Sequence, residues 1–330
     1  MPRNHTGTRG AFQAGAAILG VLALAASADI ARSQDYPLRA IKIVVPNPPG
    51  GSSDIAARML SDYLSTVWSE PVVVENRPGA NTQIGAAAVV HAAPDGYTLL
   101  IGTPSLSTFK VYLKDPGFDV EKDLAPISEI LVSPFIVAVN AQLPVKNIAE
   151  LIALAKKSPG KLNYGGFGGG QILATELFKK TAGIDLVRVP YQGEAPAIAG
   201  LAGNDVQVVF ATAVTVPPMI AAGRVKALAV TTRTRLPSMP DVPTITESGG
   251  PDYDVGLWFG LLAPANTPAD ILQKIAAQVA AFTKKPEVAE RFLPLGFTTK
   301  SSTPDEFRHL IAEETQRWIE VAQFASIAPQ

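Results

Sequence analysis

The chain contains no cysteine, and this absence excludes disulfides, cysteine nucleophiles, thiolate metal sites and a lipid-anchored cysteine. Histidine is scarce too, with only His5, His91 and His309. None of the three has a second ligand at metal-site spacing, and neither HExxH nor GxSxG occurs. The sequence therefore displays no nucleophile, base or metal set, although a carboxylate pair assembled by folding stays open.

Charge is also sparse, because charged residues make up 17% of the 330 residues and hydrophobic residues 47%. This is the composition of a globular protein and not of a disordered chain. Lys and Arg together number 28 against 29 for Asp and Glu, so no basic excess points to nucleic acid. The length is sufficient for two hydrophobic cores.

Residues 1–33 have the pattern of a secretory signal peptide. Arg3 and Arg9 form a positive start, and the uncharged stretch 10–28 is rich in Ala, Leu, Ile and Val. Cleavage is expected after Ala28 or near Ser33. An uncleaved membrane anchor is the alternative, but Ala and Gly dilute the hydrophobicity of this stretch. We therefore expect a mature protein in the periplasm, exported by the Sec route.

Strand patterns alternate with helix patterns along the mature chain, which favours an α/β fold with largely parallel sheets. Helices are expected from Asp54, from Asn147, over about 172–180, before Gly223, and after 267–270 and 303–306. Strands are expected at 41–45, 71–75, 97–102, 135–139, 162–164, 206–210, 225–230 and 258–263.

Several helix starts carry a capping signal. Ser52 or Ser53 is expected to cap the helix that begins at Asp54. Asn147 and Thr303 are each followed by Glu three residues later, the arrangement of a capping box. Pro268 is expected at the first position of its helix.

Two similar strand–Pro–helix passages, at 135–150 and 258–275, are interpreted as two crossings between domains. Domain 1 would then comprise 35–134 plus 257–330, and domain 2 would comprise 135–256. Trp258, at the second crossing, is interpreted as core or hinge packing.

Two glycine-rich loops each lie between a strand and a helix, at 47–53 and 165–170. Glycine lets the backbone approach a ligand closely, and a helix N-terminus offers free N–H groups with partial positive charge, which suits a carboxylate. Neither loop has the Lys-Ser/Thr of a Walker loop or completes GxGxxG. A flexible connection is the alternative for either loop alone, but one loop in each expected domain favours a clamp on an anion.

Eight segments occur in the order found in one known family: 45–51, 75–80, 94–100, 161–164, 189–193, 227–230, 243–249 and 258–268. Asp54 and Arg58 follow the first of these segments and belong to the same motif. The chain therefore resembles the Bug (TctC-like) solute receptors of tripartite tricarboxylate transporters. The resemblance implies a type II periplasmic-binding-protein fold, with two domains joined by a two-crossing hinge that close like a Venus flytrap. It also implies carboxylate recognition by backbone N–H groups and bridging waters of the two loops.

The second loop departs from this family, whose members usually carry serines there and a histidine at the next helix. Here glycine replaces the hydroxyl donors and Phe167 is added. The difference suggests a ligand whose distal part is less polar or larger, such as an aromatic or medium-length dicarboxylate. For Tyr191 two interpretations stay open: it lines the cleft, or it packs in the core. The candidate ligand-binding residues are Asn47, Pro48, Pro49, Gly50, Gly51, Ser52, Ser53, Asp54, Thr103, Gly166, Phe167, Gly168, Gly169, Gly170, Gln171, Tyr191 and Ala211.

The sequence thus predicts a periplasmic solute-binding protein, and not an enzyme, that captures a small carboxylate for uptake. The ligand classes are di- or tricarboxylates, aromatic carboxylates and amino acids. The expected partners are the membrane subunits of the transporter, and the protein is expected to be a monomer without cofactor, metal or nucleic acid. Two alternatives are a ligand sensor for a two-component system and a secreted α/β hydrolase.

Overall fold

The structure is a computed structural model that describes residues 36–329, so the expected signal peptide lies outside the described residues. The strands form one mixed sheet in the order β2-β1-β3-β9-β4-β7-β5-β6, with β8 and β10 also paired to β4. Their bounds are β1 Ile41–Val45, β2 Val72–Asn76, β3 Thr98–Gly102, β4 Leu124–Asn140, β5 Asn163–Gly166, β6 Val187–Pro190, β7 Val208–Thr212, β8 Val225–Val230, β9 Gly256–Pro264 and β10 Thr298–Thr299.

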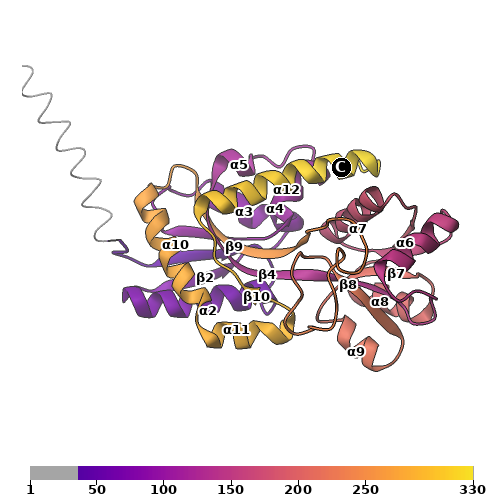
Figure 1. Cartoon of the computed structure of the whole chain (residues 1–330). Coiled ribbons are helices and arrows are strands. Elements are labelled where there is room, and N and C mark those ends of the chain that lie inside the picture. Colours follow the sequence, from indigo (N-terminus) through magenta and orange to yellow (C-terminus); the bar gives the residue numbers. More distant parts are fainter. Residues whose placement is uncertain (1–35, 330) are drawn as a thin grey trace, which may run out of the picture.

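Helices cover both faces of this sheet, and two of the short ones are 3-10 turns (Figure 1). The bounds are α2 Ser52–Trp68, η1 Ala80–Thr82, α3 Gln83–Val90, α4 Ser105–Tyr112, α5 Val120–Asp123, α6 Ile148–Lys157, α7 Gly169–Ala182, α8 Glu194–Gly203, α9 Val216–Ala221, α10 Ala269–Thr283, α11 Pro286–Phe292, η2 Leu293–Leu295 and α12 Pro304–Phe324.

Two long strands, β4 and β9, run through the middle of the molecule (Figure 1). We call β1–β3 with α2, α3, α4 and α10 the first lobe, and β5–β8 with α6–α9 the second lobe. β4 pairs antiparallel with β9 and β10 toward the first lobe and with β7 and β8 toward the second. The residue boundaries of two domains stay a prediction.

The length of β4 differs from the expected strand at 135–139. Pro126 and Pro134 normally interrupt a ladder because proline lacks an N–H group. Here β4 continues through both, and its register against β9 shifts between Pro126 and Ser128 and again between Glu129 and Leu131. The first shift lies beside Pro126, whereas Pro134 pairs in regular register with Gly256 at the start of β9, and β4 is a continuous strand of 17 residues.

The hydrophobic cores follow the lobes, and α12 joins both. Phe307 and Ile311 pack in a first-lobe cluster with Trp258. Trp318 and Val321 near the other end of α12 pack in the second-lobe cluster. Figure 1 shows α12, in yellow, extending over both parts. This helix therefore bridges the two lobes on one face of the sheet.

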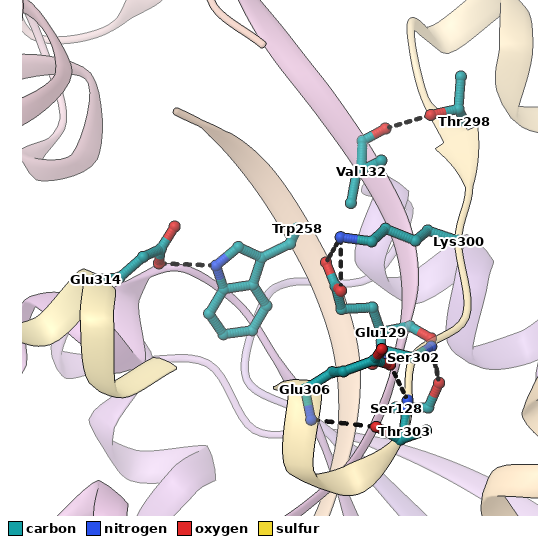
Figure 2. Close-up of polar contacts among 10 residues, drawn as sticks. All are labelled: Ser128, Glu129, Val132, Trp258, Thr298, Lys300, Ser302, Thr303, Glu306 and Glu314. Atoms are coloured by element: carbon teal, nitrogen blue, oxygen red, sulfur yellow. Dashed lines mark hydrogen bonds and ion pairs between the residues drawn. The ribbon is translucent and has the colours of Figure 1, made fainter. Parts of the chain in front are cut away.

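The capping box at Thr303 is confirmed. Its Oγ1 accepts from the Glu306 N–H at 3.2 Å, and the Glu306 carboxylate accepts from the Thr303 N–H at 2.8 Å (Figure 2). The Asn147 side chain accepts from the Glu150 N–H, but the Glu150 carboxylate accepts from the Lys146 N–H and not from that of Asn147, so the capping box predicted there is incomplete.

Two other capping predictions are wrong. Gly51 is the N-cap of α2 and no side chain caps that helix, so Ser52 and Ser53 both lie in its first turn. Pro268 is the N-cap of α10 and not its first helical residue. Within residues 36–329, neither α2 nor α10 therefore has a side-chain hydrogen bond that caps its N-terminus.

Trp258 packs in the core as interpreted, with 2% of its surface exposed. Its ring meets that of Phe307 edge to face, and its Nε1–H donates to the Glu314 carboxylate at 2.9 Å (Figure 2). Burial raises the pKa of Glu314 to about 7, although the Trp258 hydrogen bond opposes the rise. Nearby, Lys300 pairs with the buried Glu129 at 2.8 Å. These contacts fasten β4, β9 and α12 together.

Candidate functional site

A cavity of about 660 Å³ lies between the two glycine-rich loops. The first lobe contributes the loop after β1, Asn81, and the segment from Thr103 to Thr108. The second lobe contributes the loop after β5 together with Thr212 and Val214. The central strands and the segment around η2 complete the wall. Because both lobes supply walls, a ligand here would contact both at once.

None of the residues that line this cavity is Asp, Glu, Lys, Arg or His. Three helices begin at its wall instead: α2 with Gly51 as N-cap, α4 with Pro104 and α7 with Gly168. A helix N-terminus carries free N–H groups and partial positive charge. The cavity can therefore attract an anion through backbone groups without any charged side chain.

Asp54 holds the first loop in place. Its carboxylate is buried, with 3% of the residue exposed, and accepts from the Gly50 N–H at 2.9 Å. Arg58 Nε at 3.0 Å and Asn76 Nδ2 at 2.9 Å donate to the same group. Burial alone would raise the pKa of Asp54, but these donors hold it below its usual value. Asp54 therefore acts as a fixed acceptor inside the loop and does not line the cavity.

Gln171 has the corresponding place in the second loop. Its Oε1 accepts from the Phe167 N–H at 3.1 Å, and its Nε2 donates to the Gly165 carbonyl at 3.2 Å. These bonds close the loop tightly enough for α7 to begin at Gly169, three residues before the expected start. Two of the six expected loop residues are consequently the first residues of a helix.

The second loop also touches the first lobe. The Tyr112 hydroxyl of α4 donates to the Gly169 carbonyl at 2.9 Å. A Cβ atom at Gly169 would lie 2.5 Å from the Tyr112 ring, so only glycine fits here. Burial raises the pKa of Tyr112 to about 12. This contact fixes the start of α7 against α4.

Part of the cavity wall is apolar. Phe259 and Phe297 stack with ring centres 5.1 Å apart and an angle of 25° between the planes. Phe135, Leu257 and Leu295 line the cavity with them, and Phe167 and Val214 add two further apolar side chains from the second lobe.

The structure brings most of the candidate residues to the cavity. Gly50, a residue of the first loop, and Asp54 in the first turn of α2 do not line it, and Gly166 is buried at the end of β5. Ala211 is fully buried within β7. Tyr191 packs against Gly165 and Gly200 in the second lobe, the second of its two alternatives. The candidates that line the cavity are Asn47, Pro48, Pro49, Gly51, Ser52, Ser53, Thr103, Phe167, Gly168, Gly169, Gly170 and Gln171.

Several lining residues were not among the candidates. Ser105 and Thr108 follow β3, and the carboxyl end of a parallel strand next to a chain crossing is where α/β sheets place ligands, which is a usable signal. No local pattern marks Asn81 or Phe297, because chain segments distant in sequence bring them to the wall. The remaining additional lining residues are Pro104, Ser133, Phe135, Thr212, Val214, Leu257, Phe259 and Leu295.

Within residues 36–329, no three His, Cys, Asp or Glu side chains gather in a way that could hold a metal ion. Over the same residues, each helix is too short or too polar to cross a bilayer.

Comparison with solved structures identifies solute-binding proteins. A protein described as R. palustris Rpa4515 with adipate is 34% identical, with a TM-score of 0.71 over 89% of this chain and 100% of that one. The periplasmic binding protein BugD is 32% identical, with a TM-score of 0.68 over 89% and 100%. MatC (Rpa3494) from Rhodopseudomonas palustris with bound malate is 30% identical, with a TM-score of 0.67 over 87% and 99%.

These neighbours confirm the predicted two-domain periplasmic-binding-protein fold. They are binding proteins and not enzymes, so the prediction of a non-catalytic receptor is confirmed as well. The family model described as the tripartite tricarboxylate transporter family receptor, TctC, matches residues 56–326. The chain therefore belongs to the TctC family of tripartite tricarboxylate transporter receptors, which the Bug-like segments of its sequence predicted.

Proposed function

We propose that this protein is a periplasmic receptor that captures a small organic carboxylate in the cavity and presents it to the membrane subunits of a tripartite tricarboxylate transporter. The observation that carries the proposal is a cavity wall without charged side chains on which three helix N-termini open. Such a wall stabilises a carboxylate through N–H groups. The neighbours with bound adipate and malate support this ligand class.

The ligand has an apolar body, either aromatic or of medium length. Phe135, Leu257, Phe259 and Phe297 offer it a hydrophobic surface, and a cavity of about 660 Å³ is large for a four-carbon acid. Each methylene group that is buried contributes roughly 0.8 kcal/mol. Adipate or benzoate should therefore bind more tightly than malate.

Ligand contacts come from both loops. Asn47 and 51–53 approach the ligand from the first lobe, and 167–171 from the second. Asp54 supports the first loop by accepting from the Gly50 N–H, and the Gly166 carbonyl accepts from the Tyr191 N–H at the base of the second. The bodies that close on the ligand correspond to 35–134 plus 257–330 and to 135–256, and differential affinity for the closed state drives the motion.

The mature protein acts in the periplasm after residues 1–33 have been removed. The positive start and the uncharged apolar stretch support this, as does the family's role as transporter receptors. Mass spectrometry of the protein from the periplasmic fraction should give an N-terminus between residues 29 and 34. A chain that keeps residue 1 and stays in the cytoplasmic fraction would contradict this placement.

Thermal unfolding with adipate, benzoate, malate and glutamate, each with its neutral amide as control, tests the function. A carboxylate present at 100 times its Kd should stabilise the fold by about 2.7 kcal/mol, which raises Tm by several degrees. The amides should leave Tm unchanged. Equal shifts by acids and amides, or no shift by any acid, would contradict carboxylate capture.

A further inference from the structure

The turn Ala80–Thr82 has an unusual backbone. Ala80, Asn81 and Thr82 have φ values of 45°, 50° and 77°, all in the left-handed region. Residues other than glycine seldom adopt this region, and a β-branched threonine does so least readily. The Gln83 side chain holds the turn by donating to the Pro116 carbonyl at 2.8 Å. The consequence of this conformation is that Asn81 joins the cavity wall.

A second residue of the same cavity wall carries a buried hydroxyl. Thr103 lines the wall, is 7% exposed, and its Oγ1 has no hydrogen-bond partner in the described structure. A buried polar atom without a partner is costly and uncommon in a native protein, so it needs an explanation. The 3-10 turn contacts α4, which begins just after Thr103, so Asn81 and Thr103 belong to the same side of the wall.

We propose that Asn81 and Thr103 form a neutral polar subsite that hydrogen-bonds a carboxylate oxygen of the ligand and helps to select it. The inference rests on the proposed function. The Asn81 amide and the Thr103 hydroxyl both offer donors, and neither brings a charge into the neutral wall. Binding would give the Thr103 hydroxyl the partner that it lacks.

Thr103→Val separates this role from a structural one, because valine keeps the shape and removes the hydroxyl. The ligand-free variant should unfold at the same or a higher temperature, since an unpartnered buried group is lost. Affinity for adipate, benzoate or malate, whichever the wild type binds most tightly by calorimetry, should fall about 5- to 20-fold, the loss of one charge-assisted hydrogen bond.

Thr315→Val in α12 is the control. Thr315 is likewise buried, with 4% of its surface exposed, but it does not line the cavity and its hydroxyl donates to the Ile311 carbonyl of its own helix. The same substitution at Thr315 should leave affinity unchanged. Equal affinities of wild type, Thr103→Val and Thr315→Val would overturn the subsite.

Asn81→Asp tests the other member while it keeps the side-chain shape. A negative charge in a wall that has no other charged side chain should lower affinity for the same acid at least tenfold, and less so at high salt. Asn81→Gly permits the left-handed backbone and deletes the amide, so it should give a smaller loss. Unchanged affinity in both variants would overturn the role of Asn81.

These binding measurements distinguish failure of the Asn81–Thr103 subsite from failure of the proposed receptor function. If the wild type binds an acid and the variants bind it equally well, the subsite is wrong and the receptor function stands. If the wild type binds none of the four acids used for thermal unfolding, the proposed function fails and the subsite fails with it.

Discussion

The two glycine-rich loops are held by the same hydrogen-bond pattern. In the first, the side chain at the third helical position, Asp54, accepts from the Gly50 N–H four residues earlier. In the second, Gln171 at the third position of α7 accepts from the Phe167 N–H, also four residues earlier. In both loops the helix folds a side chain back onto the loop that precedes it.

The loops differ in charge. Asp54 places a carboxylate in the first turn of α2, where it compensates part of the positive end of the helix. α7 has no acidic residue in its first turn. The first loop therefore gains rigidity from an ionic network with Arg58 and Asn76, and the second keeps its positive end for a ligand. We expect a bound carboxylate to lie nearer α7.

Asp54→Ala has the largest expected effect because three donors lose one shared acceptor. The free energy of unfolding should fall by about 4 kcal/mol, at roughly 1 to 1.5 kcal/mol for each donor. Asp54→Asn should lose less. Since partners lower the pKa of Asp54 in the folded state, its contribution is present above the unfolded pKa and disappears as pH falls through the folded value. A denaturant titration of Asp54→Ala within 1 kcal/mol of wild type would refute the rigid first loop.

Glu314 is a buried acid outside both loops, and its pKa is shifted upward, opposite to that of Asp54. The pKa of Glu314 is 4.5 in the unfolded chain and about 7 in the folded protein. Stability should therefore decrease from about pH 4.5 to pH 7 by up to about 3 kcal/mol and then level off. Glu314→Gln should remove this slope and leave carboxylate affinity unchanged. Denaturant titrations across this range check it, and an unaltered slope would contradict the burial effect.

Gly169→Ala and Gly51→Ala compare the loops directly. A methyl group at Gly169 meets the Tyr112 ring, whereas the nearest atom to one at Gly51 is 4.0 Å away. We expect Gly169→Ala to cost about 2 kcal/mol of stability through overpacking and Gly51→Ala less than about 1 kcal/mol. Chemical denaturation of both variants measures the difference. Equal costs would mean that the α4–α7 contact gives way easily.

Gln171→Glu should have the smallest effect, and it acts on binding. The new carboxylate gives α7 the acidic first turn that α2 has. Affinity for the carboxylate ligand should fall about fivefold at low salt, or about 1 kcal/mol. Calorimetry at pH 8, where the new group is ionised, measures it. Unchanged affinity would place the anion away from α7.

Short-range patterns in the sequence predicted much of the fold. The capping box at Thr303 and the strand β8 at Val225–Val230 depend on hydrogen bonds and alternation within a few residues, so local rules suffice. The glycine-rich loops were visible for the same reason. The ordered set of segments that resembles the Bug (TctC-like) family predicted, in addition, the two-domain periplasmic-binding-protein fold.

Long-range contacts account for what the sequence did not predict. β4 keeps Pro126 beside a shift in its register against β9, and Pro134 opposite Gly256, the first residue of β9. Asn81 reaches the wall through a left-handed turn that asparagine tolerates but Ala80 and Thr82 disfavour, and Phe297 through stacking on Phe259. Ala211 was a candidate for the cavity, but it is fully buried within β7, where it pairs with Ile136 of β4.

A crystal structure with bound adipate or benzoate tests most directly whether backbone amides of the two loops receive the anion. We predict one carboxylate within hydrogen-bond distance of the first N–H groups of α7, with the apolar body against Phe259 and Phe297. A carboxylate that points to solvent, or one paired with a lysine or arginine side chain outside this cavity, would contradict it.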